Sequence, residues 1–311
     1  HVPGRIMRMR WAIAAALMAA LALAGCRRAS GADDRPTVTV SIPPQAWMLE
    51  QIAGHDLKVN TLLPPGADAE TFEPSMQAQR DLERSCEYAM VGTLPFERAI
   101  FPKLHGMYPD LLITETFHPD AAEHDYGPQP LTLDSRPSTH HHEHDHGVDP
   151  HVWTTPEHLQ VMADSLLAAA IRANPSEAPK YRKNHVSLSR RLAGLQAQME
   201  RDLAPLRGRD IVIWHPSLSY MAEEFGFRQV AVQEGHKEPS PRRMGNVIDQ
   251  VSRRGAVAFV IEKEHSPRMA EALDADMRLP LVHTSLMQPD IVAALSALSS
   301  QLSALARNSQ L

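Results

Sequence analysis

The chain has 311 residues, of which 43% are hydrophobic, so it is long enough to bury the cores of two ordinary domains. Its formal net charge is −6, and aromatic residues make up only 5% of it. A protein that binds nucleic acid needs a basic surface, so this composition argues against DNA or RNA as a partner.

The N-terminus has the features of an export signal. Two arginines precede an apolar stretch from Trp11 to Ala24, which is too short for a comfortable membrane span. The stretch closes with Leu23-Ala24-Gly25-Cys26, which resembles a bacterial lipobox, where the cysteine is acylated and becomes the mature N-terminus. A plain secretory signal and a weak anchor helix are the alternatives. We expect residues 1–26 to be a lipoprotein signal peptide with a start assigned too early, and residues 27–36 to be a flexible tether.

The chain has two cysteines, and they have different expected roles. If Cys26 carries the lipid, Cys86 has no partner for a disulfide within the chain. A lone cysteine in an exported protein is more often a small buried apolar side chain than a reactive thiol. We therefore expect Cys86 to be buried.

Short apolar strands alternate with helical patterns after the tether. Strands are predicted at residues 37–42, 59–63, 88–91 and 111–114. Alternation of strands and helices is typical of βαβ units around a parallel sheet. Residues 37–173 are therefore expected to form an N-terminal α/β lobe.

A long helix is predicted to follow this lobe. Thr155 and Pro156 begin one helix, with threonine as the N-cap, and Asn174-Pro175 ends it and begins another. Apolar residues then recur at helical spacing as far as about Arg207 without a breaker. A helix of roughly 30 residues would span about 45 Å, more than one small lobe needs. We expect residues 174–207 to be a rigid helix that links two lobes.

The remaining residues repeat the α/β pattern. Strands are predicted at 211–214, 229–233, 257–261 and 281–284, and helices at 220–225, 240–255 and 291–305. Residues 208–308 are therefore expected to form a C-terminal α/β lobe. The predicted fold class is α/β, with two lobes that each hold a parallel-type sheet flanked by helices.

A histidine-rich loop is expected at residues 138–148. Residues 140–146 hold five histidines, which have too little apolar area to build a core: His140, His141, His142, His144 and His146. Neutral imidazole is the commonest protein ligand of zinc and its neighbours, so the segment is interpreted as a metal collector. A solvated polar loop without this role, or a tag-like tract, is the alternative.

Four residues could bind a metal themselves or lie next to residues that could. They follow predicted strands or precede a predicted helix: Glu70, His151, His215 and Ser285. Ligands of open α/β sheets bind outside the carboxyl ends of the strands, where such loops meet. Taken singly, each has an ordinary explanation as a surface acid, a cap or a hydrogen-bonded histidine. Their joint placement on comparable loops of two lobes favours a metal site. Three other histidines are expected to be helix-surface or loop residues: His158, His185 and His236.

Several stretches, in order along the chain, carry a family resemblance: Leu63-Pro64-Pro65-Gly66-Ala67-Asp68, Phe72-Glu73-Pro74, Asp149-Pro150-His151-Val152-Trp153, Trp214-His215-Pro216-Ser217, Tyr220, Glu238-Pro239-Ser240-Pro241 and Phe259-Val260-Ile261-Glu262. With them the chain resembles the periplasmic metal-binding lipoproteins of zinc and manganese ABC importers, the ZnuA/TroA-like solute-binding family. The resemblance implies two α/β lobes joined by one long helix, with the metal held between the lobes. It also implies a membrane permease as the partner.

The resemblance also shows where the chain departs from the family. His151 and His215 match two ligand positions, whereas Glu70 stands where a histidine is usual and Ser285 where an aspartate is usual. Glutamate still binds metal as a carboxylate, but a serine hydroxyl is a poor zinc ligand. A fourth or accessory role is therefore considered for three further residues: His283, His265 and Glu262. Of these three, Glu262 is expected to act through a hydrogen bond that orients one of the metal ligands.

Two imidazoles and one carboxylate suit tetrahedral Zn²⁺. The same set with open positions also suits Fe²⁺, and sites richer in carboxylates favour Mn²⁺. The histidine-rich loop favours zinc over both. The predicted function is capture of Zn²⁺ by a monomeric receptor, anchored through lipidated Cys26 in the periplasm or at the cell surface, and its delivery to an ABC importer permease, without catalysis.

Two other functions fit parts of the sequence. A zinc metalloenzyme also uses two histidines and a glutamate with an open position, but the chain has no His-Glu-x-x-His motif. An adhesin or interaction lipoprotein would keep only a degenerate metal site. A separate possibility is that the site between the lobes has degenerated and the histidine-rich loop is the main metal binder. Metal stoichiometry and a test for hydrolysis distinguish the three functions.

Overall fold

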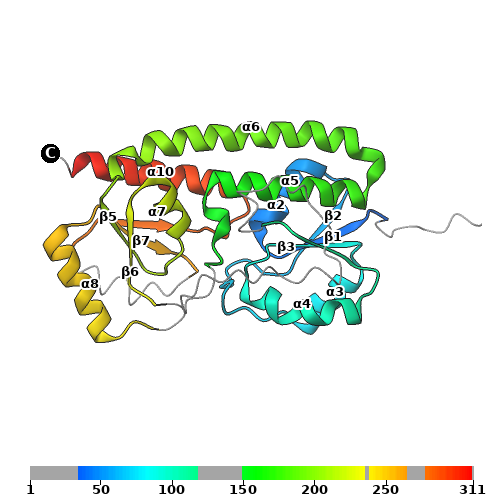
Figure 1. The fold of residues 1–311 in the computed structure, drawn as a ribbon, viewed down its shortest axis with the longest axis horizontal. Coiled ribbons are helices and arrows are strands. Elements are labelled where there is room, and N and C mark those ends of the chain that lie inside the picture. The colour runs from blue at the N-terminus through cyan, green and yellow to red at the C-terminus, as the bar shows by residue number, and fades with distance from the viewer. Residues whose placement is uncertain (1–33, 118–148, 235–237, 265–276, 310–311) are drawn as a thin grey trace, which may run out of the picture. The chain divides into compact units, whose positions relative to one another are not determined.

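The computed structural model describes residues 34–117, 149–234, 238–264 and 277–309. They form two four-stranded parallel sheets flanked by helices, within one compact unit that begins at Pro36 (Figure 1). The two-lobed α/β fold is thereby confirmed, while the domain boundaries stay predictions. The segment up to residue 33 with Cys26, the histidine-rich loop, His236 and His265 lie outside the described residues.

The sheet of the N-terminal lobe has the strand order β2-β1-β3-β4, and each neighbouring pair is parallel. Its strands are β1 (Thr37–Val40), β2 (Lys58–Thr61), β3 (Glu87–Met90) and β4 (Leu112–Glu115). The accompanying helices are α2 (Pro43–Ala53), α3 (Met76–Glu83), α4 (Pro95–Met107) and α5 (Pro156–Ala173). Strand β1 ends two residues earlier than predicted because Ile42 is the N-cap of α2.

The C-terminal lobe repeats this topology with the order β6-β5-β7-β8, again all parallel. Its strands are β5 (Asp210–Ile213), β6 (Arg228–Ala231), β7 (Phe259–Glu262) and β8 (Leu281–Thr284). Its helices are α7 (Ser219–Phe225), α8 (Pro241–Arg254) and α10 (Ile291–Asn308). Parallel strands place all their carboxyl ends at one edge of each sheet, where ligands bind in such folds.

One long helix, α6 (Ala178–Leu203), follows α5. Its 26 residues correspond to about 39 Å, shorter than the predicted length of roughly 45 Å. The difference arises because short 3₁₀ helices flank it at Pro175–Glu177 and Ala204–Leu206. The buried face carries the apolar residues that predicted the helix: Leu188, Leu192, Leu195, Met199 and Leu203.

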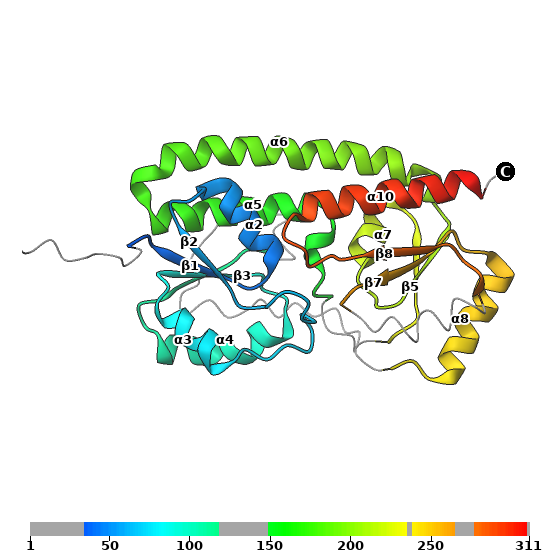
Figure 2. The ribbon, with the colours of Figure 1, turned by 180° about the vertical axis from the view of Figure 1, so that it is seen from behind.

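Helix α6 contacts both lobes. In its N-terminal half Asn184 Nδ2 donates to the Ile52 carbonyl of α2 at 2.9 Å. In its C-terminal half Gln198 Nε2 donates to the Ser296 carbonyl of α10 at 3.3 Å. Figure 2 shows α6 running beside α5 and α2 at one end and beside α10 at the other. The prediction of one long helix joining the lobes is confirmed.

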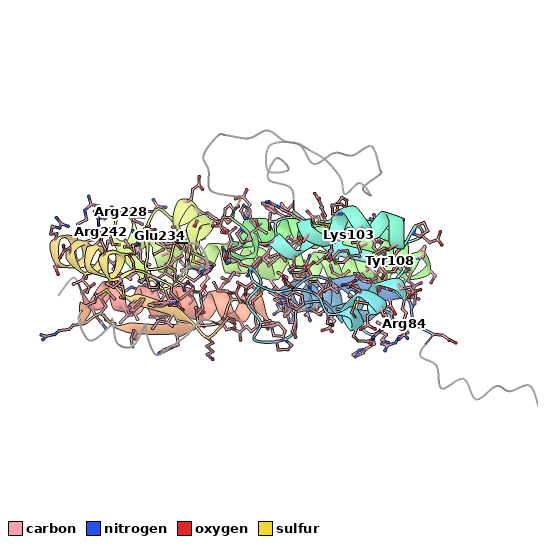
Figure 3. All side chains as sticks on the ribbon, turned by 90° about the horizontal axis from the view of Figure 1, so that it is seen from below. Arg84, Lys103, Tyr108, Arg228, Glu234 and Arg242 are labelled. Atoms are coloured by element: carbon pink, nitrogen blue, oxygen red, sulfur yellow. The ribbon has the colours of Figure 1, made fainter. Side chains whose placement is uncertain are left out.

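Two surface features complete the fold. Cys86 is exposed, so the prediction that it is buried was wrong; its Sγ lies 3.2 Å from the Thr37 carbonyl in the turn before β3. Charged side chains of both signs lie on the surface, including Arg84 and Lys103 on one lobe, and Arg228, Arg242 and Glu234 on the other (Figure 3). Within the described ranges, no helix is both long and apolar enough to cross a membrane.

A buried carboxylate, Glu97, anchors the start of α4. Its oxygens accept backbone N–H groups from Val91 at 2.6 Å, Gly92 at 2.8 Å and Leu94 at 3.1 Å, and also the Ser41 hydroxyl. Burial raises the pKa of Glu97 to about 7, although these hydrogen bonds favour the charged form and lower it. The carboxylate therefore ties the end of β3 to the helix that follows.

The raised pKa of Glu97 predicts how stability changes with pH. An unfolded glutamate titrates near 4.3, so between about pH 4.5 and pH 7 the folded state binds more protons than the unfolded state. The contribution of Glu97 to the free energy of unfolding should therefore fall as pH rises through this window and level off above about pH 7. Urea unfolding of the wild type and Glu97→Gln from pH 5 to pH 8 measures it. A wild-type minus variant difference that rises with pH would contradict the assignment.

Candidate metal centre

Glu70 lies in the loop that follows β2. The Asp68 side chain accepts the Glu70 N–H at 2.8 Å, which holds this part of the loop in a local turn. Ala69 is buried, and the side chain of Glu70 is only 9% exposed. Glu70 is thus not a solvated surface acid, and its carboxylate is turned toward the residues of the other loops.

His151 is held in place by Asp149. Oδ1 of Asp149 accepts the His151 backbone N–H at 2.9 Å and lies 2.8 Å from its ring Nδ1. A carboxylate on one ring nitrogen fixes the tautomer and leaves Nε2 as the atom available to a metal. The ring also packs 5.4 Å from the fully buried Trp153, between centroids. Tyr220 of the other lobe donates its hydroxyl to the Asp149 carbonyl at 3.0 Å.

His215 is the second residue after β5 and is almost completely buried. Its Nδ1 lies 3.3 Å from Oε1 of Gln233, a residue that follows the neighbouring strand β6. A side-chain amide on Nδ1 again leaves Nε2 as the atom that faces the loops of the first lobe. Both histidines therefore present the same ring nitrogen, each positioned by a partner from its own lobe.

The three side chains meet at the carboxyl ends of the strands. Nε2 of His215 lies 3.3 Å from one carboxylate oxygen of Glu70, and Nε2 of His151 lies 3.8 Å from the other. One ligand atom from each residue can be chosen so that all lie within 4.8 Å of one another. Among the histidines, cysteines and carboxylates of the described residues, these three gather this closely, and they come from both lobes.

The charges around the cluster favour a cation. Burial lowers the pKa of His215, but the hydrogen bond and charge of Glu70, together with Glu262 and Asp68, raise it by more, so that the net shift is upward. For Asp149 burial raises the pKa, but the hydrogen bonds and charge of His151 lower it by more, so that the net shift is downward. Carboxylates thus surround the two imidazoles, and positive charge is stabilised between them.

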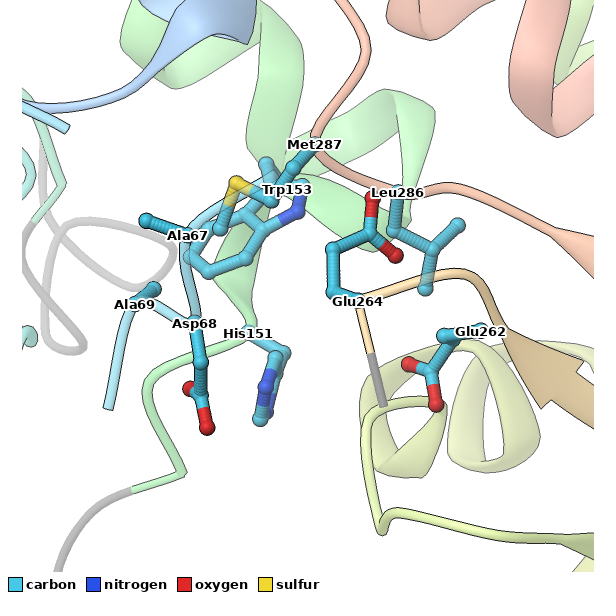
Figure 4. Close-up of a pocket in the computed structure, with 9 residues that line it drawn as sticks. All are labelled: Ala67, Asp68, Ala69, His151, Trp153, Glu262, Glu264, Leu286 and Met287. Carbon is cyan, nitrogen blue, oxygen red and sulfur yellow. The ribbon is translucent and has the colours of Figure 1, made fainter. Parts of the chain in front are cut away.

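A small cavity of about 20 Å³ opens beside the cluster (Figure 4). One side is formed by Asp68 and His151, and the other by Glu262 and Glu264. Apolar side chains complete the lining: Ala67, Ala69, Trp153, Leu286 and Met287. The volume is that of about one water-sized sphere, which suits an ion rather than an organic substrate.

The additional candidates from the sequence occupy different places. Glu262 ends β7, is buried and lines the cavity. Ser285 follows β8 and donates its hydroxyl to Glu264, which lines the cavity. His283 is exposed on β8. Among the described residues, its ring nitrogens do not belong to the group of ligand atoms that lie within 4.8 Å of one another.

Several residues that support the site were not assigned a role from the sequence. Asp149 and Gln233 position the two imidazoles, and the spacing Asp-x-His was the available signal for the first. His158, expected on a helix surface or in a loop, is instead packed between Phe117 and Tyr220 at 4.6 and 4.9 Å. Its Nδ1 lies 3.1 Å from the Val152 carbonyl, so it supports the turn that carries His151.

Comparison with known proteins gives a consistent result. The family model "Zinc-uptake complex component A periplasmic" (ZnuA) matches residues 38–301. The zinc-binding lipoprotein AdcA of Streptococcus pneumoniae is 22% identical over 275 residues, which cover 84% of this chain and 52% of AdcA. The chain thus spans about half the length of the curated relatives that it matches first.

Solved structures share the fold. A zinc-bound deletion mutant of ZnuA has a TM-score of 0.71 and 25% identity, with 87% of this chain and 97% of that one covered. The periplasmic zinc-binding protein TroA from Treponema pallidum has a TM-score of 0.72 and 17% identity, with 88% and 99% covered. The match of the family model to most of the chain decides the assignment: the protein belongs to the ZnuA family of periplasmic zinc-uptake components.

Proposed function

We propose that this protein is an extracytoplasmic receptor that captures Zn²⁺ and delivers it to the permease of an ABC importer. The observation that carries the proposal is the convergence of Glu70, His151 and His215 from two lobes. The proposal agrees with membership of a zinc-uptake family and with the zinc-binding description of AdcA. A receptor needs binding alone, and Zn²⁺ is its cargo.

The distances in the cluster suit zinc. Two ligand atoms each about 2.0–2.1 Å from a tetrahedral ion lie about 3.3–3.4 Å apart. The separation of 3.3 Å between His215 and Glu70 already has this value, and that of 3.8 Å between His151 and Glu70 is slightly wider. These two separations run to different oxygens of Glu70, and one ligand atom from each of the three residues lies within 4.8 Å of the others, so the three side chains must draw closer together to bind one ion. Nitrogen ligands favour Zn²⁺ over Mn²⁺, and Fe²⁺ is expected to bind more weakly by the usual order of affinities.

The location and partners belong to the same proposal. The receptor acts in the periplasm or at the cell surface, as a monomer anchored through lipidated Cys26. This is supported by the match to a family of periplasmic components and by the description of AdcA as a lipoprotein. Mass spectrometry of the mature protein tests the anchor, because acylation adds a defined mass to the cysteine. An intact N-terminus without lipid would exclude this form of attachment.

Metal analysis of protein purified without an affinity tag tests the proposed function. We expect one tightly bound Zn²⁺ per chain, no zinc-dependent hydrolysis of peptide or ester substrates, and restored growth at limiting zinc when the gene complements a strain without its receptor. Zinc-dependent hydrolysis would instead indicate a metalloenzyme. Protein that binds no zinc would indicate an interaction lipoprotein with a degenerate site.

The contact between Asp149 and His151 predicts how strongly zinc affinity depends on a residue that only positions a ligand. Replacing it with alanine removes the acceptor on Nδ1 of His151, and loss of such a partner typically weakens metal binding roughly 10–100-fold. Asp149→Asn, which keeps an oxygen acceptor but loses the charge, should fall between wild type and Asp149→Ala. Competition with a chromogenic chelator measures both. Equal zinc affinity in all three proteins would contradict the role given to Asp149.

A further inference from the structure

The cluster of Glu70, His151 and His215 leaves one tetrahedral position of a zinc ion to be filled. With one carboxylate and two neutral imidazoles, it also leaves the bound ion with a net charge of about +1 in a buried place. Such charge is costly unless it is compensated. A second carboxylate at the fourth position would satisfy both needs. Among the described residues, Glu262 offers a buried carboxylate oxygen at the cavity beside this cluster.

The register of the sheet places Glu262 beside His215. Strands β5 and β7 are parallel neighbours in which Ile213 pairs with Val260, and two residues further His215 comes level with Glu262. Side chains two residues apart point to the same face of a strand. Ile213 and Val260 both belong to the larger core cluster, so His215 and Glu262 continue the face that this cluster covers.

One oxygen of Glu262 is buried without a partner. The residue is 4% exposed, and its Oε1 accepts the Ser217 hydroxyl. Its Oε2 is buried and has no hydrogen-bond partner. A buried carboxylate oxygen without a partner loses the hydrogen bonds that water gave it, and buried polar groups usually have a partner in the folded protein.

That carboxylate is turned toward the cavity beside the cluster. Glu262 lines the wall opposite Asp68 and His151 (Figure 4). Burial raises the pKa of Glu262 to about 7, while the Ser217 hydrogen bond and the charges of His215 and His151 lower it. Among the described residues Glu262 is not one of the group whose ligand atoms lie within 4.8 Å of one another, so its carboxylate must move from the cavity wall toward the cluster to reach the ion.

The register also separates Glu262 from two other candidates. Glu262 pairs with Thr284 of β8, whereas His283 pairs with Ile261 and so belongs to the opposite face of the sheet. Ser285 has its hydroxyl committed to Glu264. A one-residue offset is enough to remove His283 from the site, because alternate residues of a strand face opposite sides.

We propose that Oε2 of Glu262 is the fourth ligand of the cargo ion, which completes a site of two imidazoles and two carboxylates. The inference rests on the proposed function, because it assigns a ligand to that same ion. Each lobe then contributes one histidine and one glutamate. Two carboxylates balance the charge of a divalent ion, and the imidazoles retain the preference for zinc.

Glu262→Gln tests the proposal with little change of shape. Glutamine keeps the acceptor for Ser217 and replaces only the oxygen assigned to the ion. We expect the variant still to bind one Zn²⁺ but about 100-fold more weakly in chelator competition. Without metal it should melt at the same temperature as the wild type or higher, because an unpaired buried charge has been removed. Glu223→Gln, on the exposed surface of α7, makes the same charge change as a control and should bind zinc like the wild type.

Each outcome of this experiment decides a different point. If the wild type binds no zinc, the proposed function fails, and the ligand assignment fails with it. If the wild type binds zinc and Glu262→Gln binds it equally well, the function stands and the assignment is overturned. The assignment is also overturned if Glu223→Gln weakens binding as much, or if Glu262→Gln lowers the melting temperature of the metal-free protein, since that would indicate a structural role.

Discussion

Replacing His215 with alanine is expected to weaken zinc binding roughly 1000-fold or more, which corresponds to about 4 kcal/mol. Its Nε2 lies 3.3 Å from Glu70, the separation that two ligands of one zinc ion require. The variant loses a bond to the metal itself, so the loss should exceed the roughly 10–100-fold effect of removing a supporting partner. No other imidazole of the described group is available to take its place, since His151 already occupies its own position.

Chelator competition with zinc measures this effect, and His185→Ala is the matched control. His185 lies on α6, where its Nε2 is 2.7 Å from Asp164, and it is not part of the cluster. We expect the control to bind zinc as the wild type does. Tight binding of one zinc per chain by His215→Ala would contradict the assignment of His215 as a zinc ligand. It would indicate that another segment, such as the histidine-rich loop, is the main zinc-binding site.

Replacing Arg172 with methionine is expected to destabilise the fold by about 3 kcal/mol. Arg172, in the last turn of α5, holds Glu87 of β3 through two hydrogen bonds, one of them from Nε at 3.2 Å. Glu87 is completely buried, so the variant leaves its charge with only the Thr114 hydroxyl, at 2.7 Å. Removing one partner of a buried ion pair typically costs 3–5 kcal/mol, and the partial exposure of Arg172 favours the lower end.

Urea unfolding of the metal-free protein measures the loss. The double variant Arg172→Met with Glu87→Gln removes the buried charge but keeps an acceptor for Thr114. It should recover much of the lost stability, because the cost arises from the unpaired charge rather than from packing. A single variant that loses less than about 1 kcal/mol, or a double variant that is less stable than the single one, would contradict this explanation.

Local patterns were sufficient to predict the fold. The four strands of each lobe were expected from short apolar runs that alternate with helical patterns, and the helix start at Thr155 was expected from its capping signal. The structure shows that cap as a hydrogen bond from the His158 N–H to the Thr155 hydroxyl. The helix α6 was expected from its apolar spacing. Its length was overestimated because Pro175 and Pro205 lie in 3₁₀ turns that continue the same pattern without being α-helical.

The site was only partly predictable, because its details depend on register. Glu70, His151 and His215 were selected from their positions after strands, and the structure brings them together. Whether His283 or Glu262 faces them depends on one residue of offset between β7 and β8, which no local pattern reveals. The supporting roles of Asp149 and Gln233 likewise require knowing which ring nitrogen each one contacts.

Cysteine exposure shows the same limit. The expectation for Cys86 came from the general behaviour of lone cysteines in exported proteins. Its actual place is the turn before β3, where its backbone and its Sγ both contact the Thr37 carbonyl and the side chain remains at the surface. Residue type predicted burial, but position in the fold decided it.

A zinc-bound crystal structure, with anomalous diffraction recorded on both sides of the zinc absorption edge, tests the central claim most directly. We predict one anomalous peak between the lobes, about 2.0–2.2 Å from Nε2 of His151, Nε2 of His215 and an oxygen of Glu70. Zinc found elsewhere in the molecule, or zinc that does not contact both histidines, would contradict the account.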